Sequence, residues 1–194
     1  MVKLLIRFGA NLNTKNKDGS TALIMATVNN QINSLKLLIK EGADINLKNK
    51  YNHNALMYAA LEGNQEIVKL LINSGIDLNL QDNNGFTALS MTINENINDI
   101  TKILIESKAN LDCQDNNGLT ALFLAVYQNN YDIVKLLLEN GANPKIKSNN
   151  GYTALDVAEE YSDLQTIKLL KSYIKKENNF LRKIYNYCSD IIPI

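Results

Sequence analysis

Five side chains in this sequence could take part in catalysis or metal binding: His53, Cys113, Cys188, Glu159 and Glu160. His53 is the only histidine, so a zinc site with several histidines and a relay through a second histidine are excluded. Neither Cys113 nor Cys188 has a cysteine or histidine beside it in the sequence. Two cysteines cannot form a disulfide framework, so we expect ordinary thiols in a reducing compartment.

Carboxylates could supply acid–base chemistry, and Glu159 and Glu160 are the most suggestive pair. Adjacent residues on a helix point in different directions, so a solvated helix face explains them better. The sequence contains no glycine-rich dinucleotide or phosphate loop and no zinc-protease motif of the His-Glu-x-x-His type. We therefore expect no catalytic residue, no cofactor and no metal, and predict that the protein is not an enzyme.

Charge and hydropathy narrow the range of partners. The chain of 194 residues carries 20 basic and 20 acidic side chains, a balance that argues against nucleic acid as a partner. No apolar run approaches the roughly 20 residues that a membrane-spanning helix needs, and the N-terminus has no signal-peptide pattern. Location in the cytoplasm, or in a host cytoplasm for a translocated protein, is the expectation.

A repeat of 33 residues organises almost the whole chain. The dipeptide Ala-Leu recurs at this spacing, preceded by Thr or, once, by Asn, and glycine occupies the position two residues before that Thr in four of the five copies. The dipeptides are Ala22-Leu23, Ala55-Leu56, Ala88-Leu89, Ala121-Leu122 and Ala154-Leu155. Markers that keep one register without an insertion indicate stacked structural units.

Each unit reads as two short helices followed by a turn. The Thr or Asn before Ala-Leu is a good N-cap for a first helix, which is too short to be stable alone. A polar turn such as 62–64 separates it from a second helix with apolar residues at helical spacing, for example Ile67, Val68, Leu70 and Leu71. A glycine such as Gly75 ends that helix, and an Asn-Gly dipeptide such as Asn84-Gly85 predicts a tight turn.

This pattern closely resembles the ankyrin repeat. The match to the family motif reads Asp115-Asn116-Asn117-Gly118-Leu119-Thr120-Ala121-Leu122-Phe123, then Val134-Lys135-Leu136-Leu137 and Gly141-Ala142. Two departures are systematic. The family's proline after Thr is Ala in all five units, and its histidine after Leu is replaced by Ile24, Met57, Ser90, Phe123 or Asp156. Because that histidine joins hydrogen bonds between repeats in the family, we expect this network to be weaker or absent.

The resemblance implies an all-α fold, an ankyrin-repeat α-solenoid with a short C-terminal helical tail. We place the array at residues 1–176, with a half repeat at 1–15 and full repeats at 16–48, 49–81, 82–114, 115–147 and 148–176. Residues 177–194 form the tail, which is predicted to be a capping helix. The half repeat is interpreted either as a natural ragged cap or as the edge of a longer array.

The repeat at 82–114 departs most from the pattern. Ser90 and Thr92 are expected to interrupt its first helix, and Thr101 replaces an aliphatic core residue. Lys108 occupies the position of the helix-ending glycine, where a left-handed conformation costs other residues roughly 1–2 kcal/mol. We therefore expect this repeat to be the least stable part of the array.

A row of large side chains is the candidate binding site. In ankyrin proteins the turn tips and the exposed side of the first helix line the concave face, which is the usual binding surface. The positions that correspond here are Tyr51, His53, Leu61, Phe86, Leu119, Tyr127, Tyr152 and Tyr161. Large apolar or aromatic groups exposed together mark interaction sites, although Phe86 and Leu119 could instead pack on a neighbouring turn.

We accordingly predict a non-catalytic protein–protein interaction module that binds a partner protein through its concave surface. The partner is a host protein if the chain is a microbial effector, or a cognate protein that it inhibits. The alternative is a structural or oligomerisation module that uses the N-terminal half repeat and the C-terminal tail. A monomer is expected in the first case, and a dimer through the tail in the second.

Overall fold

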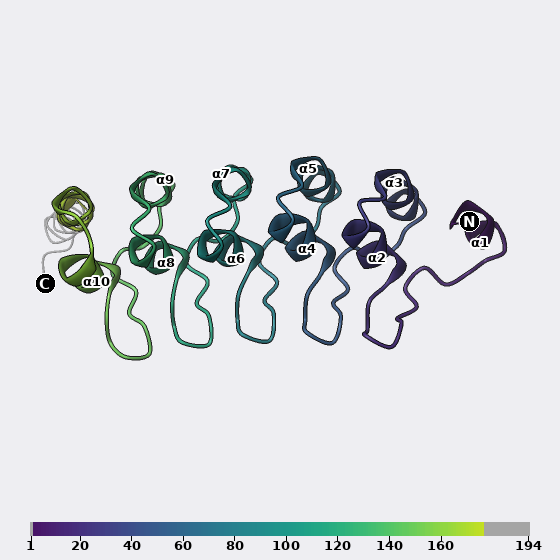
Figure 1. The fold of residues 1–194 in the computed structure, drawn as a ribbon, viewed down its shortest axis with the longest axis horizontal. Coiled ribbons are helices and arrows are strands. Elements are labelled where there is room, and N and C mark those ends of the chain that lie inside the picture. The colour runs from purple at the N-terminus through teal and green to yellow at the C-terminus, as the bar shows by residue number, and fades with distance from the viewer. Residues whose placement is uncertain (1, 177–194) are drawn as a thin grey trace, which may run out of the picture.

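Residues 2–176 are described by a computed structural model, in which pairs of antiparallel helices stand side by side in a row (Figure 1). An inner layer of short helices lies between an outer layer of longer helices and a series of long loops, here called fingers. The inner helices are α2 (Ala22–Val28), α4 (Ala55–Leu61), α6 (Ala88–Asn94), α8 (Ala121–Tyr127) and α10 (Ala154–Tyr161). The outer helices are α3 (Ile32–Lys40), α5 (Gln65–Asn73), α7 (Asn98–Glu106) and α9 (Tyr131–Glu139), followed by helical residues 164–176.

Every inner helix begins at the residue that the sequence predicts. The side-chain oxygens of Thr21 and Asn54 accept hydrogen bonds from the backbone N–H of Ile24 and Met57, and the Thr before each later Ala-Leu does the same. Such a cap satisfies one of the free amides in the first turn and contributes about 1 kcal/mol. The cap therefore fixes where each seven- or eight-residue helix starts.

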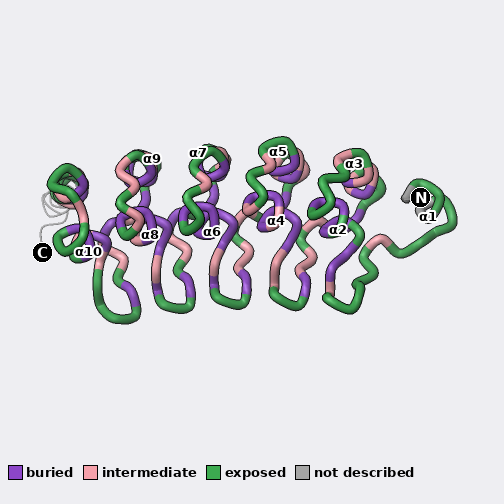
Figure 2. The backbone as a smooth tube through the Cα atoms, in the orientation of Figure 1, coloured by how far each residue is buried: buried purple, intermediate pink, exposed green. Residues whose placement is uncertain are grey.

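The hydrophobic core runs the length of the row between the two helix layers (Figure 2). Each of the middle inner helices packs against the inner helices before and after it as well as against its own outer helix. In α4, five of seven residues are buried, and Ala59 and Ala60 are small enough for close helix contact. The outer helices bury one face only, as their apolar spacing predicts.

The finger turns need a left-handed residue, and the sequence supplies one each time. Gly118 has φ of +76°, and a Cβ there would lie 2.7 Å from the backbone nitrogen of Asn149 in the next finger. Asn52, which replaces this glycine in one repeat, also has positive φ, at 61°. Lys108 has φ of 66° and thus ends α7 in the conformation expected at that position.

Hydrogen bonds between fingers form a ladder along the row. The backbone N–H of Asn83, Asn116 and Asn149 donates to a carbonyl of the preceding finger, at 3.2, 3.0 and 2.9 Å. The side-chain amides of the same residues donate to a second carbonyl of that finger, at 3.3, 2.9 and 2.9 Å. These bonds connect neighbouring repeats without the histidine of the family motif.

A second ladder lies nearer the helices. The carboxamide oxygens of Asn13, Asn46 and Asn79 each accept a hydrogen bond from a backbone N–H in the next repeat, 31 residues further on. Asp112 accepts the equivalent bond from Asn143 at 2.9 Å. Much of the abundant asparagine of this chain therefore serves to hold adjacent repeats in register.

The repeat at 82–114 differs from the sequence-based expectation. Helix α6 runs through Ser90 and Thr92 without a break, so the predicted interruption is wrong. The Ser90 hydroxyl accepts a hydrogen bond from the Thr87 N–H at 2.8 Å and completes a capping box. Thr92 and Thr101 are fully buried, and the Thr101 hydroxyl donates to that of Thr92 at 3.0 Å.

The ends of the row are less regular. Helix α1 (Val2–Arg7) stands where the second helix of a preceding repeat would be, and Leu4 and Phe8 at this end are 54% and 82% exposed. The predicted tail helix at residues 177–194 lies outside the described residues. Within residues 2–176, the helices are all too short or too polar to cross a membrane.

Candidate protein-binding surface

The eight candidate residues lie on the fingers and the inner helices, but their exposure differs. Tyr51, Tyr127, Tyr152 and Tyr161 are 51–65% exposed, so these four rings are open to solvent. His53, Leu61, Phe86 and Leu119 are partly buried. Leu61, Phe86 and Leu119 pack in part against the core, which agrees with the structural alternative considered for Phe86 and Leu119.

Three tyrosines gather at the C-terminal end of this face. Tyr127 is the last residue of α8, Tyr161 is the last residue of α10, and Tyr152 lies on the finger between them. A hydrogen bond with Glu160 raises the pKa of Tyr161, and Tyr127 and Tyr152 are close enough to raise it further. We call Tyr127, Tyr152 and Tyr161 the tyrosine cluster. It presents phenol side chains, which combine a rigid apolar ring with a polar end.

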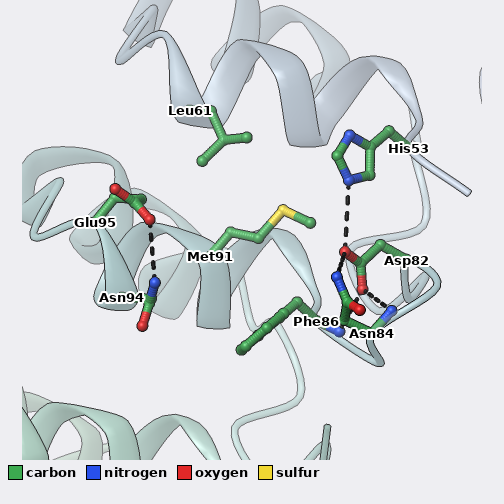
Figure 3. Close-up of a pocket in the computed structure, with 8 residues that line it drawn as sticks. All are labelled: His53, Leu61, Asp82, Asn84, Phe86, Met91, Asn94 and Glu95. Atoms are coloured by element: carbon green, nitrogen blue, oxygen red, sulfur yellow. Dashed lines mark hydrogen bonds and ion pairs between the residues drawn. The ribbon is translucent and has the colours of Figure 1, made fainter. Parts of the chain in front are cut away.

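Three of the remaining candidates surround a hollow between the repeats at 49–81 and 82–114 (Figure 3). The hollow has a volume of about 230 Å³ and lies between α4, α6 and the finger residues around Asp82. It is lined by His53 and Leu61 from one repeat and by Asp82, Asn84, Phe86, Met91, Asn94 and Glu95 from the next. We call it the interrepeat hollow.

Asp82 organises the finger wall of the interrepeat hollow. Its Oδ1 accepts hydrogen bonds from the backbone N–H groups of Asn84 and Phe86, at 2.9 and 2.8 Å. Its Oδ2 lies 3.5 Å from Nε2 of His53, while the His53 ring meets Tyr58 edge-on with centroids 5.4 Å apart. The His53 side chain is 22% exposed, so this histidine is part of a contact between two repeats and is not a free turn residue.

The other lining residues were not among the sequence-based candidates. Met91 is buried in α6, and Asp82 is a buried residue of the finger. Asn94 and Glu95 lie at the end of α6, where polar residues are expected in any repeat. Repeat register alone could have paired Glu95 with Leu61, because inner-helix ends of neighbouring repeats stack side by side.

The structure also shows the surroundings of two residues that were considered for catalysis, Glu159 and Cys113. The Glu159 carboxylate forms an ion pair with Lys171 at 2.7 Å. Partial burial, with Asp112 and Asp77 nearby, raises the pKa of the Cys113 thiol and so disfavours the reactive thiolate. Across residues 2–176, histidine, cysteine and carboxylate side chains do not form a group that could hold a metal ion. Cys188 lies outside the described residues.

Helix pairs stacked in a row and joined by fingers define an α-solenoid repeat protein. A family model described as ankyrin repeats (3 copies) matches residues 1–82, 74–148 and 93–180. The chain belongs to the ankyrin repeat family, whose repeats generally serve as protein–protein interaction modules and are typically non-catalytic. A search of curated proteins finds no significant match.

Proposed function

We propose that this protein binds a partner protein through the face formed by the fingers and the inner helices, without catalysing a reaction. The observation that carries the proposal is the exposure of the tyrosine cluster, with Tyr127, Tyr152 and Tyr161 at 65, 55 and 63%. Three neighbouring tyrosines offer a large rigid area that loses little conformational freedom on binding. The partner is a host protein if the chain acts as an effector, or a cognate protein that it inhibits.

Because these tyrosines are exposed, substituting them can test binding without a large effect on folding. Tyr127 and Tyr152 contribute little to the core, because more than half of each side chain already contacts water. Burial of these rings contributes free energy only when a partner protein covers them. Replacing both should therefore weaken binding much more than it weakens the fold.

The test is affinity capture from the native cell with the purified protein as bait. We expect Tyr127→Ala with Tyr152→Ala to reduce the captured partner by about tenfold or more, and to leave the thermal midpoint nearly unchanged. Tyr131→Ala, on the outer helix α9, is the matched control and should retain capture. A large drop in the thermal midpoint of the double variant, or equal capture by all three proteins, would contradict the proposal.

A second candidate function, self-association, is favoured by the N-terminal end of the row. Met25 and Val28 of α2 are 41% and 45% exposed, and Phe8 is 82% exposed. In the inner helices further along, Tyr58, Met91 and Leu124 take the position of Met25 and are partly or fully buried. Sedimentation would test this function: a concentration-dependent dimer that is lost on Phe8→Ser or on deletion of residues 177–194 would favour it.

A further inference from the structure

The interrepeat hollow combines an apolar lining with acidic groups. Leu61, Phe86 and Met91 provide carbon and sulfur surface, while Asp82 and Glu95 provide two carboxylates. No lysine or arginine is among the described residues that line it. Two carboxylates face a single histidine, so the hollow carries a net negative charge next to apolar surface.

Glu95 is the carboxylate best placed to meet a ligand. It follows the last residue of α6 and is exposed, and one of its oxygens accepts a hydrogen bond from the Asn94 amide at 3.1 Å. Among the described residues, no ion pair engages Glu95. Asp82 is different, because two backbone N–H groups and the nearby His53 already surround its buried carboxylate.

We propose that the interrepeat hollow receives an arginine side chain of the partner protein. The inference rests on the proposed function and states the chemistry that the partner brings to this face. The aliphatic stem of arginine lies along Phe86 and Met91, and its guanidinium reaches the Glu95 carboxylate. Charge complementarity selects a cation here, since an acidic side chain would be repelled by both carboxylates.

Arginine fits this lining better than lysine. Its planar fork carries five N–H donors, and the rim offers several acceptors because Asn84 and Asn94 stand beside the carboxylates. The ring of Phe86 also adds a favourable face for a guanidinium. The volume of about 230 Å³ suits one side chain rather than a helix or a strand.

The direct test uses small probes, so that it does not depend on the partner. Protein labelled at the methionine methyl groups is titrated with N-acetyl-arginine methylamide and followed by NMR. The uncharged citrulline analogue and the lysine analogue serve as comparison ligands. Met91 lines the hollow, so its methyl signal reports occupancy.

We expect the arginine probe to shift the Met91 methyl signal saturably, and the citrulline probe to bind at least about fivefold more weakly. Glu95→Gln should weaken the arginine probe about threefold or more, because it removes the charge and keeps the shape. Glu62→Gln is the matched control. Glu62 is exposed and lies 33 residues earlier at the same position of the repeat, so affinity should not change.

Three outcomes would overturn the assignment: no saturable shift at Met91, equal binding of the citrulline probe, or tighter binding of the lysine probe. An equal loss in Glu95→Gln and Glu62→Gln would also overturn it. The Tyr127→Ala, Tyr152→Ala variant should bind the arginine probe normally. Loss of partner capture and loss of probe binding therefore report on the proposed function and on this inference separately.

Discussion

The buried threonine pair in the repeat at 82–114 allows a quantitative test of how this repeat is stabilised. Thr92 and Thr101 replace an alanine and an aliphatic residue of the other repeats, and both are 0% exposed. The Thr101 hydroxyl lies 3.0 Å from the Thr92 hydroxyl and 3.1 Å from the carbonyl of Ile97. The Thr92 hydroxyl donates in turn to the carbonyl of Leu89 at 2.9 Å.

The magnitude follows from what each substitution removes. Thr101→Val keeps the volume and leaves the Thr92 hydroxyl with its acceptor, so the loss is one hydrogen bond, about 1 kcal/mol of unfolding free energy, partly offset by the added methyl group. Thr92→Ala also removes a methyl group from the core and should cost about 1–2 kcal/mol. Because both single variants lose the same hydrogen bond, the double variant should be about 1 kcal/mol more stable than the sum of the two losses predicts.

Urea unfolding followed by circular dichroism measures the four proteins of this double-mutant cycle, and the slopes must agree for the comparison to hold. The matched control introduces the threonine pair into the neighbouring repeat, at the equivalent positions, as Ala59→Thr with Val68→Thr. The two new hydroxyls should pair, so the coupling energy should have the same sign. A coupling energy below about 0.3 kcal/mol in the first cycle would refute the reasoning, because substitutions at sites that do not interact are additive to within about that amount.

Three further predictions concern the left-handed turns and the described cysteine. Lys108→Gly should stabilise the protein by about 0.5–1 kcal/mol and raise the thermal midpoint by about 1–4 °C, since φ is 66° there; an unchanged or lower midpoint would contradict it. Gly118→Ala should lower the thermal midpoint more than Gly141→Ala does. Both glycines have positive φ, but of the two only Gly118 has backbone of the next finger where a Cβ would lie. The opposite ranking would refute the role of the finger contact. In a Cys188→Ser background, burial and the nearby carboxylates raise the pKa of Cys113, so iodoacetamide at pH 7.4 should modify it several-fold more slowly than it modifies glutathione. Alkylation of Cys113 as fast as glutathione would show that the thiol is not shielded.

The repeat pattern predicted most of the local structure. Helix caps and turns depend on interactions within a few residues of the chain, so they can be read from the sequence. Thr21 and Asn54 mark the starts of their helices, and Gly118 marks a finger turn. The prediction failed for α6, because the repeat pattern does not indicate that Ser90 completes a capping box. Nor does the pattern indicate that Thr92 pairs with Thr101 of the adjacent helix, since that pairing depends on packing.

The sequence by itself determined the fold family and the face on which the large side chains gather, because a strict 33-residue period places equivalent residues in rows. Only the tertiary structure decided how these side chains are used. It separates the exposed rings of Tyr127 and Tyr152 from the partly buried Phe86, and it brings His53 and Asp82 together across a repeat boundary. The physical reason is that exposure and contact between repeats depend on how each unit packs on the next, which no single unit encodes.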